Sequence, residues 1–363
     1  MLFRFLHRSR TAEPRKLHHD LLANIPDVIW VASRSGHASY ISPNIEAITG
    51  ISASQYVENC PEIWFASIHP DDRERVRAAF EAMFEHNQPF DIEYRCYHTD
   101  GRCLWVHDRS VRRFTKRGVE YAVGIFSDVT ARHEGQAALA ERARLSELTA
   151  EVAMHLTLSD DLQRVLQHCV ESMVRHLDAA FARIWTVDPG RSVLELQASA
   201  GMYPHIDGTH ARIPVGHLKV GRIASSRLPH LTNDVLTDPE IDDPAWARRE
   251  GMTSFAGYPI VLDNELIGVM AVFSRQRLSE AVPRTMGAIA AALAVAIVRK
   301  RAEAKIRRLS YAVERSPAMV MITDHAGVIE YVNPKFTEVT GYTSSDVLGK
   351  TPSILKSDHT PRE

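Results

Sequence analysis

Four cysteines are the first candidates for chemistry in this chain of 363 residues: Cys60, Cys96, Cys103 and Cys169. They are too few for a disulfide framework and form no C-x-x-C motif, so we expect a reducing compartment. Cys96 and Cys103 flank a predicted hairpin turn, and a four-residue loop would place them directly opposite each other, within disulfide reach. Two reduced cross-strand thiols are the simpler interpretation, and a redox pair is the alternative.

Histidines supply the second set of candidates. His205, His210, His217 and His230 crowd one loop-rich stretch, where imidazoles could bind a metal or sense pH. Their spacing is irregular, so we interpret them as solvated loop histidines and predict no metal site. His69 lies at a predicted helix start, where a capping role is favoured over ligation of haem.

Catalytic motifs are missing from the sequence, which contains no G-x-x-x-x-G-K-[ST], G-x-G-x-x-G, G-x-S-x-G or H-E-x-x-H. We therefore predict no catalytic residue in this chain. A formal charge of −2 gives no general attraction to nucleic acid or to an anionic membrane. The longest apolar run, residues 286–298, is shorter than the ~20 residues of a bilayer span and predicts a buried helix instead of a transmembrane segment.

An internal repeat organises the elements that must position these residues. Residues 25–57 align without a gap with residues 316–348. Identical pairs include Gly36/Gly327, Pro43/Pro334 and Gly50/Gly341. Each copy predicts a hairpin, a strand ended by proline, and a short helix ended by glycine.

Short helices, one longer helix and three strands follow the first copy, and this order resembles the PAS domain. The motifs that carry the resemblance are Tyr40-Ile41-Ser42-Pro43-Asn44, Thr49-Gly50, His69-Pro70-Asp71-Asp72, Asp100-Gly101, Trp105-Val106 and the stretch from Gly124 to Thr130. It assigns residues 17–132 to a PAS domain after an N-terminal tail (1–16). Residues 315–363 resemble the N-terminal half of a second, truncated PAS domain, whose apolar side chains from 320 to 336 we expect to lack sheet partners.

The residues between the copies predict a different domain. A helical stretch leads to the strands FARIWTVD and SVLELQAS, a loop, a hairpin turned at Asp263-Asn264 and an alanine-rich helix over 285–298. Residues 145–300 resemble a GAF domain, on Leu231-Thr232-Asn233-Asp234-Val235, on Gly251 with the stretch from Ser254 to Ile260, and on Ile267-Gly268-Val269-Met270. With helical linkers at 133–158 and 299–314, the predicted fold class is α+β, with antiparallel-sheet PAS and GAF domains joined by long helices.

Apolar stripes on the two linkers allow two interpretations. They are Ala138, Leu145, Leu148 and Val152 on the first linker, and Ala302, Ile306, Leu309 and Val313 on the second. Such spacing favours paired helices in a homodimer, and it also serves to pack a helix on its own domain.

The resemblance implies the sensory input region of a bacterial cytoplasmic signal-transduction protein, most specifically of a histidine kinase in a phosphorelay. Input to a cyclic-di-GMP cyclase or phosphodiesterase, or a non-catalytic dimeric adaptor, are the alternatives. A ligand or redox change in a PAS or GAF cavity would alter the packing of the joining helices. Cys60 lacks the motif of flavin-binding PAS domains, and Cys169 is not placed for a bilin, so the cofactor stays open between haem, another small ligand and none.

Overall fold

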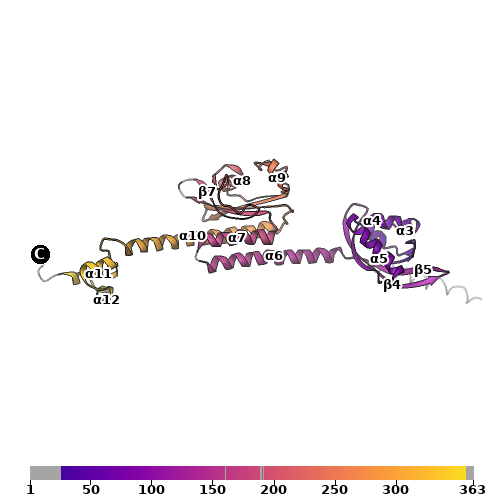
Figure 1. Ribbon diagram of the computed structural model, residues 1–363, viewed down its shortest axis with the longest axis horizontal. Coiled ribbons are helices and arrows are strands. Elements are labelled where there is room, and N and C mark those ends of the chain that lie inside the picture. The colour runs from indigo at the N-terminus through magenta and orange to yellow at the C-terminus, as the bar shows by residue number, and fades with distance from the viewer. Residues whose placement is uncertain (1–25, 160, 189, 191, 357–363) are drawn as a thin grey trace, which may run out of the picture. The chain divides into compact units, whose positions relative to one another are not determined.

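The computed structural model describes residues 26–159, 161–188, 190 and 192–356. The predicted N-terminal tail and the first residues of the predicted PAS domain lie outside the described residues. The chain divides into two compact units, residues 1–141 and 142–363, and each is described by itself. Figure 1 labels the elements along the chain.

A five-stranded antiparallel sheet forms the first unit. Its strands are β1 (Val28–Ser33), β2 (Ala38–Ile41), β3 (Asp91–Tyr97), β4 (Cys103–Lys116) and β5 (Val119–Asp128). Their order in the sheet is β2-β1-β5-β4-β3, so the first strand pairs with the last. The β1–β2 hairpin turns at Gly36, whose φ of 85° is adopted readily by glycine and rarely by other residues.

Short helices and one longer helix connect β2 to β3, in the predicted order. They are α2 (Ile45–Thr49), α3 (Ala53–Asn59), α4 (Glu62–Ser67), the 3-10 helix η1 (Pro70–Asp72) and α5 (Arg73–Glu85). Because Val76, Phe80 and Phe84 follow one another at intervals of one helical turn, α5 has a single apolar face. That face packs with Phe90 and Tyr94 in the core over the sheet.

The two copies of the repeat pair their strands in the same register. The second copy comprises β12 (Met321–Thr323), β13 (Ile329–Val332), α11 (Pro334–Thr340), α12 (Ser344–Val347) and the 3-10 helix η2 (Pro352–Leu355). Met321 lies opposite Val332, as the equivalent residues Trp30 and Ile41 lie opposite each other in the first copy. Both ladders then shift register between their second and third pairs. The alignment predicted from the sequence is therefore confirmed.

The second copy also has a small core of its own. Ile329, Val332, Phe336 and Val347 are buried, whereas Ile322 is 48% exposed. In the described residues β12 and β13 pair only with each other, as expected, yet three of the apolar side chains from 320 to 336 are buried. Helices α11 and α12 supply the contacts that were expected from further strands.

A six-stranded antiparallel sheet forms the centre of the second unit. Its strands are β6 (Phe181–Asp188), β7 (Val193–Gly201), β8 (Arg212–Pro214), β9 (His230–Thr232), β10 (Ser254–Leu262) and β11 (Glu265–Ser274). The order is β8-β7-β6-β11-β10-β9. The predicted hairpin turn is present at Asp263 and Asn264, which both have positive φ, as a two-residue type I′ turn requires.

Helices cover both faces of this sheet. They are α6 (Thr130–Leu158), α7 (Leu162–Leu177), α8 (Leu218–Ser226), α9 (Pro244–Glu250) and α10 (Val282–Glu314). Figure 1 shows α7 and α10 on one side of the sheet and α8 and α9 on the other. The alanine-rich helix and the following linker, predicted as separate segments, form the single helix α10. Only a loop was predicted where α8 and α9 lie.

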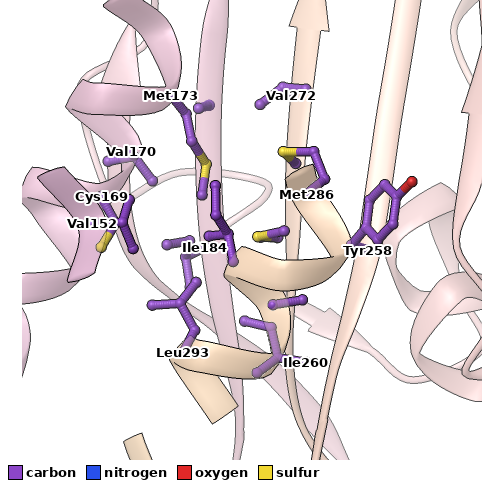
Figure 2. Close-up of a cluster of buried hydrophobic side chains, with 14 of the residues drawn as sticks. Val152, Cys169, Val170, Met173, Ile184, Tyr258, Ile260, Val272, Met286 and Leu293 are labelled. Atoms are coloured by element: carbon purple, nitrogen blue, oxygen red, sulfur yellow. The ribbon is translucent and has the colours of Figure 1, made fainter. Parts of the chain in front are cut away.

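The side with the long helices holds the larger apolar core. Figure 2 shows Val152 of α6, Met173 of α7 and Leu293 of α10 converging with Ile184 of β6. Cys169 is buried among them, and burial raises the pKa of its thiol to about 12. It is therefore an inert core residue.

Three residues of the predicted stripe on the first linker pack inside the chain, and the fourth, Ala138, is exposed. Leu145, Leu148 and Val152 are buried in the core of the second unit, so for them the interpretation as a helix packed on its own domain is correct. The stripe on the second linker differs, because Ile306 is 64% exposed and Leu309 is 58% exposed.

Helix α10 has the length and apolar composition of a membrane-spanning helix. However, Met286, Ile289, Leu293 and Ile297 are all buried in the core against the sheet. A core helix of a globular domain has the same composition, so this feature is weak evidence for a membrane span.

Candidate ligand-binding sites

The first unit encloses a small cavity between its sheet and its short helices. The cavity volume is about 60 Å³, enough for water or a very small guest. Most of its lining is apolar, from residues that include Val28, Ile45, Phe80 and Phe126. Cys60 also lines it, and burial raises the pKa of this thiol to about 11.

A chain of hydrogen bonds runs along the wall of this cavity and ends on a buried carboxylate. The indole of Trp64 donates to the hydroxyl of Tyr94 (2.8 Å), and that hydroxyl donates to Oδ2 of Asp108 (3.0 Å). Trp30 donates to the other carboxylate oxygen (2.7 Å). Burial raises the pKa of Asp108 to about 7, although both hydrogen bonds oppose the shift by stabilising the ionised form. The PAS cavity therefore contains a carboxyl group that titrates near neutral pH.

The interpretation of Cys96 and Cys103 as a redox pair is wrong for this hairpin. Tyr97 lies opposite Cys103, and Cys96 lies opposite Leu104. The two cysteines thus occupy neighbouring rows of the ladder, and because side chains alternate along a strand, their thiols point to opposite faces of the sheet. Cys96 is buried, Cys103 is exposed, and both are free thiols.

The second unit has a much larger pocket of about 640 Å³ on the sheet face that carries α8 and α9, a volume typical of small-molecule sites. Six aromatic side chains line it: Phe181, Trp185, Tyr203, Trp246, Phe255 and Phe273. Strand β6 contributes alternate residues, so Phe181 and Trp185 face the pocket while Ala182 and Ile184 face the long helices. Arg183, between the two aromatic residues, also lines the pocket.

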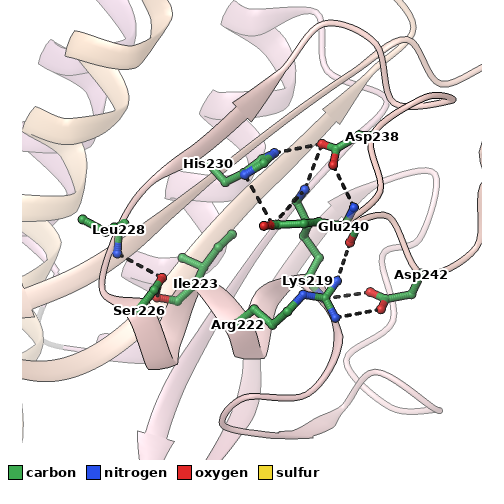
Figure 3. Close-up of polar contacts among 9 residues, drawn as sticks. All are labelled: Lys219, Arg222, Ile223, Ser226, Leu228, His230, Asp238, Glu240 and Asp242. Carbon is green, nitrogen blue, oxygen red and sulfur yellow. Dashed lines mark hydrogen bonds and ion pairs between the residues drawn. The ribbon is translucent and has the colours of Figure 1, made fainter.

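Ion pairs satisfy two of the other charged residues that line the pocket, Lys219 and Asp242. Figure 3 shows Lys219 of α8 with its ammonium against Asp238 (2.9 Å) and Glu240 (3.4 Å). Asp242 accepts from the backbone N–H of Lys219 (2.7 Å) and from Arg222 (3.1 Å). These contacts fix the loop between β9 and α9 to α8, and so they shape the pocket wall.

The histidines singled out in the sequence do not gather into one site. His230 is paired with Asp238 (2.8 Å) and Glu240, and His210 lines the large pocket. His205 and His217 are not among the lining residues. Within residues 26–356, apart from the three gaps, no group of three or more His, Cys, Asp or Glu side chains could hold a metal ion.

His69 has the capping role that its position predicts. It is the N-cap of η1, and its Nδ1 accepts a hydrogen bond from the backbone N–H of Asp71 (3.3 Å). This contact directs the ring to the helix start.

Comparison with protein families identifies the units. Residues 38–126 match a model described as a PAS fold, residues 159–298 match a GAF domain, and residues 307–363 match a second PAS fold. The chain is a PAS-GAF-PAS sensory region. The fold is the predicted one, antiparallel-sheet PAS and GAF domains with long helices.

Three similar proteins illustrate the match. An uncharacterized protein of Sinorhizobium fredii, y4lL, is 33% identical over 112 residues, which cover 31% of this chain and 13% of y4lL. The GAF domain of a phosphoenolpyruvate-protein phosphotransferase from Coxiella burnetii is 19% identical with a TM-score of 0.41, over 45% of this chain and 98% of that one. The N-terminal domain of a diguanylate cyclase with a PAS/PAC sensor from Marinobacter aquaeolei is 28% identical with a TM-score of 0.27, over 30% and 98%.

Proposed function

We propose that this PAS-GAF-PAS region is the input of a bacterial cytoplasmic signal-transduction protein, and that occupancy of the GAF pocket is the signal. The observation that carries the proposal is the alternation along β6. Phe181 and Trp185 line the pocket, and Ala182 and Ile184 between them pack in the core with α7 and α10. Only the sheet therefore separates the pocket from helices α7 and α10.

The neighbouring hairpin, β10–β11, has the same arrangement. Phe255 of β10 lines the pocket, whereas Tyr258 and Ile260 of the same strand belong to the core that holds α10. A ligand that displaces the pocket side of β10 or β6 changes the surface on which the helix rests. Since packed cores have discrete arrangements, a small displacement is expected to move the helix between two positions.

Helix α10 is suited to transmit that change. It continues for 17 residues, more than four helical turns, beyond Ile297, its last apolar contact in the GAF core. It ends at Glu314, shortly before β12 of the second PAS fold. Its later half exposes Ile306 and Leu309, which lie at helical spacing with the exposed Val295. We propose that this stripe pairs with the same stripe of a second copy in a parallel homodimer, in which a shift of one helix changes the pairing of both.

The output that we favour is a histidine kinase. One experiment tests both the sensory role and the output. The protein is isolated from its own cells through a tag on the chromosomal gene, small molecules are extracted and identified by mass spectrometry, and the intact protein is incubated with ATP or with GTP.

The proposal predicts a co-purifying small molecule and acid-labile phosphate on the protein or on a partner. Formation or hydrolysis of cyclic di-GMP would assign the region to that pathway instead. If no ligand co-purifies and neither phosphorylation nor cyclic-di-GMP turnover is detected, the sensory role is contradicted. A non-catalytic adaptor is then the remaining function.

A further inference from the structure

Arg183 is an unexpected residue for its position. It occupies the pocket side of β6, a central strand of the GAF sheet, between Phe181 and Trp185. Such a position normally holds an apolar side chain, because a charged group loses hydration there. Arg183 is half-buried, and burial lowers the pKa of its guanidinium, which nevertheless keeps its charge at neutral pH.

The protein itself supplies Arg183 with few partners. Its Nε donates to the hydroxyl of Ser199 (3.1 Å), and its guanidinium carbon lies 5.4 Å from the centre of the Phe181 ring and 5.7 Å from that of Tyr203. No carboxylate of the described residues forms an ion pair with it. The two terminal nitrogens, Nη1 and Nη2, are thus left without a protein acceptor in the described part of the chain.

The neighbouring carboxylates are engaged elsewhere. Asp242 binds Lys219 and Arg222, and Asp243 accepts from the backbone of Trp246 as the N-cap of α9. His210, another titratable residue of the lining, has a pKa lowered by partial burial and then by the charge of Arg183. It is therefore neutral at pH 7. The remaining carboxylate of the lining, Asp207, is exposed and forms no ion pair with Arg183 in the described part of the chain, so no protein carboxylate is paired with the guanidinium.

We propose that the GAF pocket binds an organic monocarboxylate with a flat apolar body, whose carboxylate pairs with the terminal nitrogens of Arg183. This inference rests on the proposed function, because it names the ligand class of the same pocket. A planar guanidinium presents two parallel N–H donors that match the two oxygens of a carboxylate. The aromatic rings around it offer faces and edges for a planar body.

A phosphate group fits this pocket less well than a carboxylate. A phosphate carries more charge and three acceptor oxygens, and protein sites for it normally add backbone N–H groups from a helix start or a glycine-rich loop. Two helix starts border the pocket. At α8 the N–H of Lys219 already donates to Asp242 and its ammonium is paired with Asp238, and at α9 the N-cap Asp243 accepts from the N–H of Trp246. The guanidinium of Arg183 is then the group available to an anion, and its single positive charge matches a ligand with a single negative charge.

Matched probes test this assignment on the full chain. They are 2-naphthoate, its neutral isostere 2-naphthamide and 2-naphthyl phosphate, each titrated by calorimetry and by thermal shift. We expect 2-naphthoate to bind at least about tenfold more tightly than the other two, the effect of one charge-assisted pair of hydrogen bonds. Equal binding of naphthoate and naphthamide, or tighter binding of the phosphate, would overturn the carboxylate assignment and leave the pocket as a ligand site.

Variants of Arg183 separate recognition from folding. Arg183→Gln should abolish the preference for naphthoate over naphthamide, and Arg183→Lys should reduce it because the fork geometry is lost. Arg212→Gln is the matched control, since Arg212 pairs with Glu195 (2.9 Å) and is not a lining residue. It should bind like the wild type.

Stability of the ligand-free protein provides the second readout. Removal of an uncompensated charge should leave the melting temperature of Arg183→Gln equal to or above that of the wild type. A marked decrease in melting temperature would show that Arg183 is structural. Failure of all three probes to bind would overturn the carboxylate inference, while the co-purification experiment tests the sensory role independently.

Discussion

The indole nitrogen of Trp30 donates a hydrogen bond of 2.7 Å to the carboxylate of Asp108, 78 residues further along the chain. The contact joins β1 to β4 across β5, which lies between them in the PAS sheet. Asp108 is 3% exposed, and its second oxygen accepts from Tyr94. Burial raises the pKa of Asp108 to about 7, and this shift makes the stability of the first PAS domain depend on pH.

Asp108 should make that domain less stable as the pH rises. Its pKa is about 7 in the folded protein and about 3.9 in an unfolded chain, so between these values only the folded state holds the proton. Stability then falls from about pH 4 to about pH 7, by at most ~1.4 kcal/mol per pH unit. Urea unfolding of wild type and Asp108→Asn at several pH values measures this.

The difference in unfolding free energy between the wild type and Asp108→Asn measures the effect of the carboxyl group. The free energy of unfolding of Asp108→Asn should increase relative to that of the wild type as the pH rises. Its amide oxygen can accept from Trp30 without carrying charge. Glu46→Gln, on the exposed surface of α2, is the control and should follow the wild type. Parallel pH profiles for wild type and Asp108→Asn would mean that Asp108 stays ionised.

Asp72 should contribute to stability in the opposite pH direction. Its Oδ2 accepts from Nε (2.8 Å) and from the backbone N–H (3.0 Å) of Arg95, and the hydrogen bond from the Arg95 side chain lowers the pKa of Asp72 to about 2. This stability is present above about pH 4 and is lost as the pH falls through about 2. We expect Asp72→Ala to cost about 1–3 kcal/mol at pH 7, since it leaves a backbone donor unpaired. A loss under about 0.5 kcal/mol in urea unfolding would refute this role.

Gly124 should not tolerate a side chain. A Cβ there would overlap the ring of Trp30 and lie 2.6 Å from the carbonyl oxygen of Arg109. We expect Gly124→Ala to destabilise the PAS domain by about 2 kcal/mol or more, because both neighbours are held in the sheet. Gly135→Ala is the control: its Cβ meets nothing within 4 Å, and alanine should favour helix α6 slightly. Similar melting curves for the two variants would contradict the packing of Trp30.

The exposed stripe of α10 should determine the oligomeric state. Ile306→Glu with Leu309→Glu places charge in the proposed seam and should convert a dimer to a monomer, as measured by sedimentation equilibrium. Arg308→Glu changes charge beside the stripe and should leave the dimer intact. A monomeric wild type, or a dimer that survives the double substitution, would exclude this seam.

The sequence predicted the fold correctly where individual residues determine the backbone conformation of a turn. Gly36 and Gly327 mark the same turn in the two copies, and Asp263 with Asn264 determines the GAF hairpin through positive φ. The family resemblance implied antiparallel sheets, and the structure adds the order of the strands within them. Gly101, whose φ is 91°, marks the turn between Cys96 and Cys103 but not the number of residues in its loop. The predicted pairing of the two cysteines was therefore off by one position.

The sites were harder to predict, because they depend on contacts between distant residues. Asp108 is one acidic residue among many until Trp30 and Tyr94 surround it, and no local pattern showed that it is buried. Leu145 and Leu148 had the spacing of a coiled-coil seam, which is also the spacing of a helix packed on its own domain. Arg183 did carry a signal, since it interrupts the apolar side of FARIW, but only the pocket explains it.

Amide hydrogen exchange along α10 tests most directly whether pocket occupancy reaches the helix. Exchange is compared between ligand-free protein and protein loaded with its co-purifying compound or with 2-naphthoate. Coupling predicts altered exchange in α10 from Gly287 to Ile297, which rests on the sheet, and beyond it to Glu314. Changes confined to the pocket strands and to α8 and α9, with α10 unaffected, would contradict transmission from the GAF pocket to the helix.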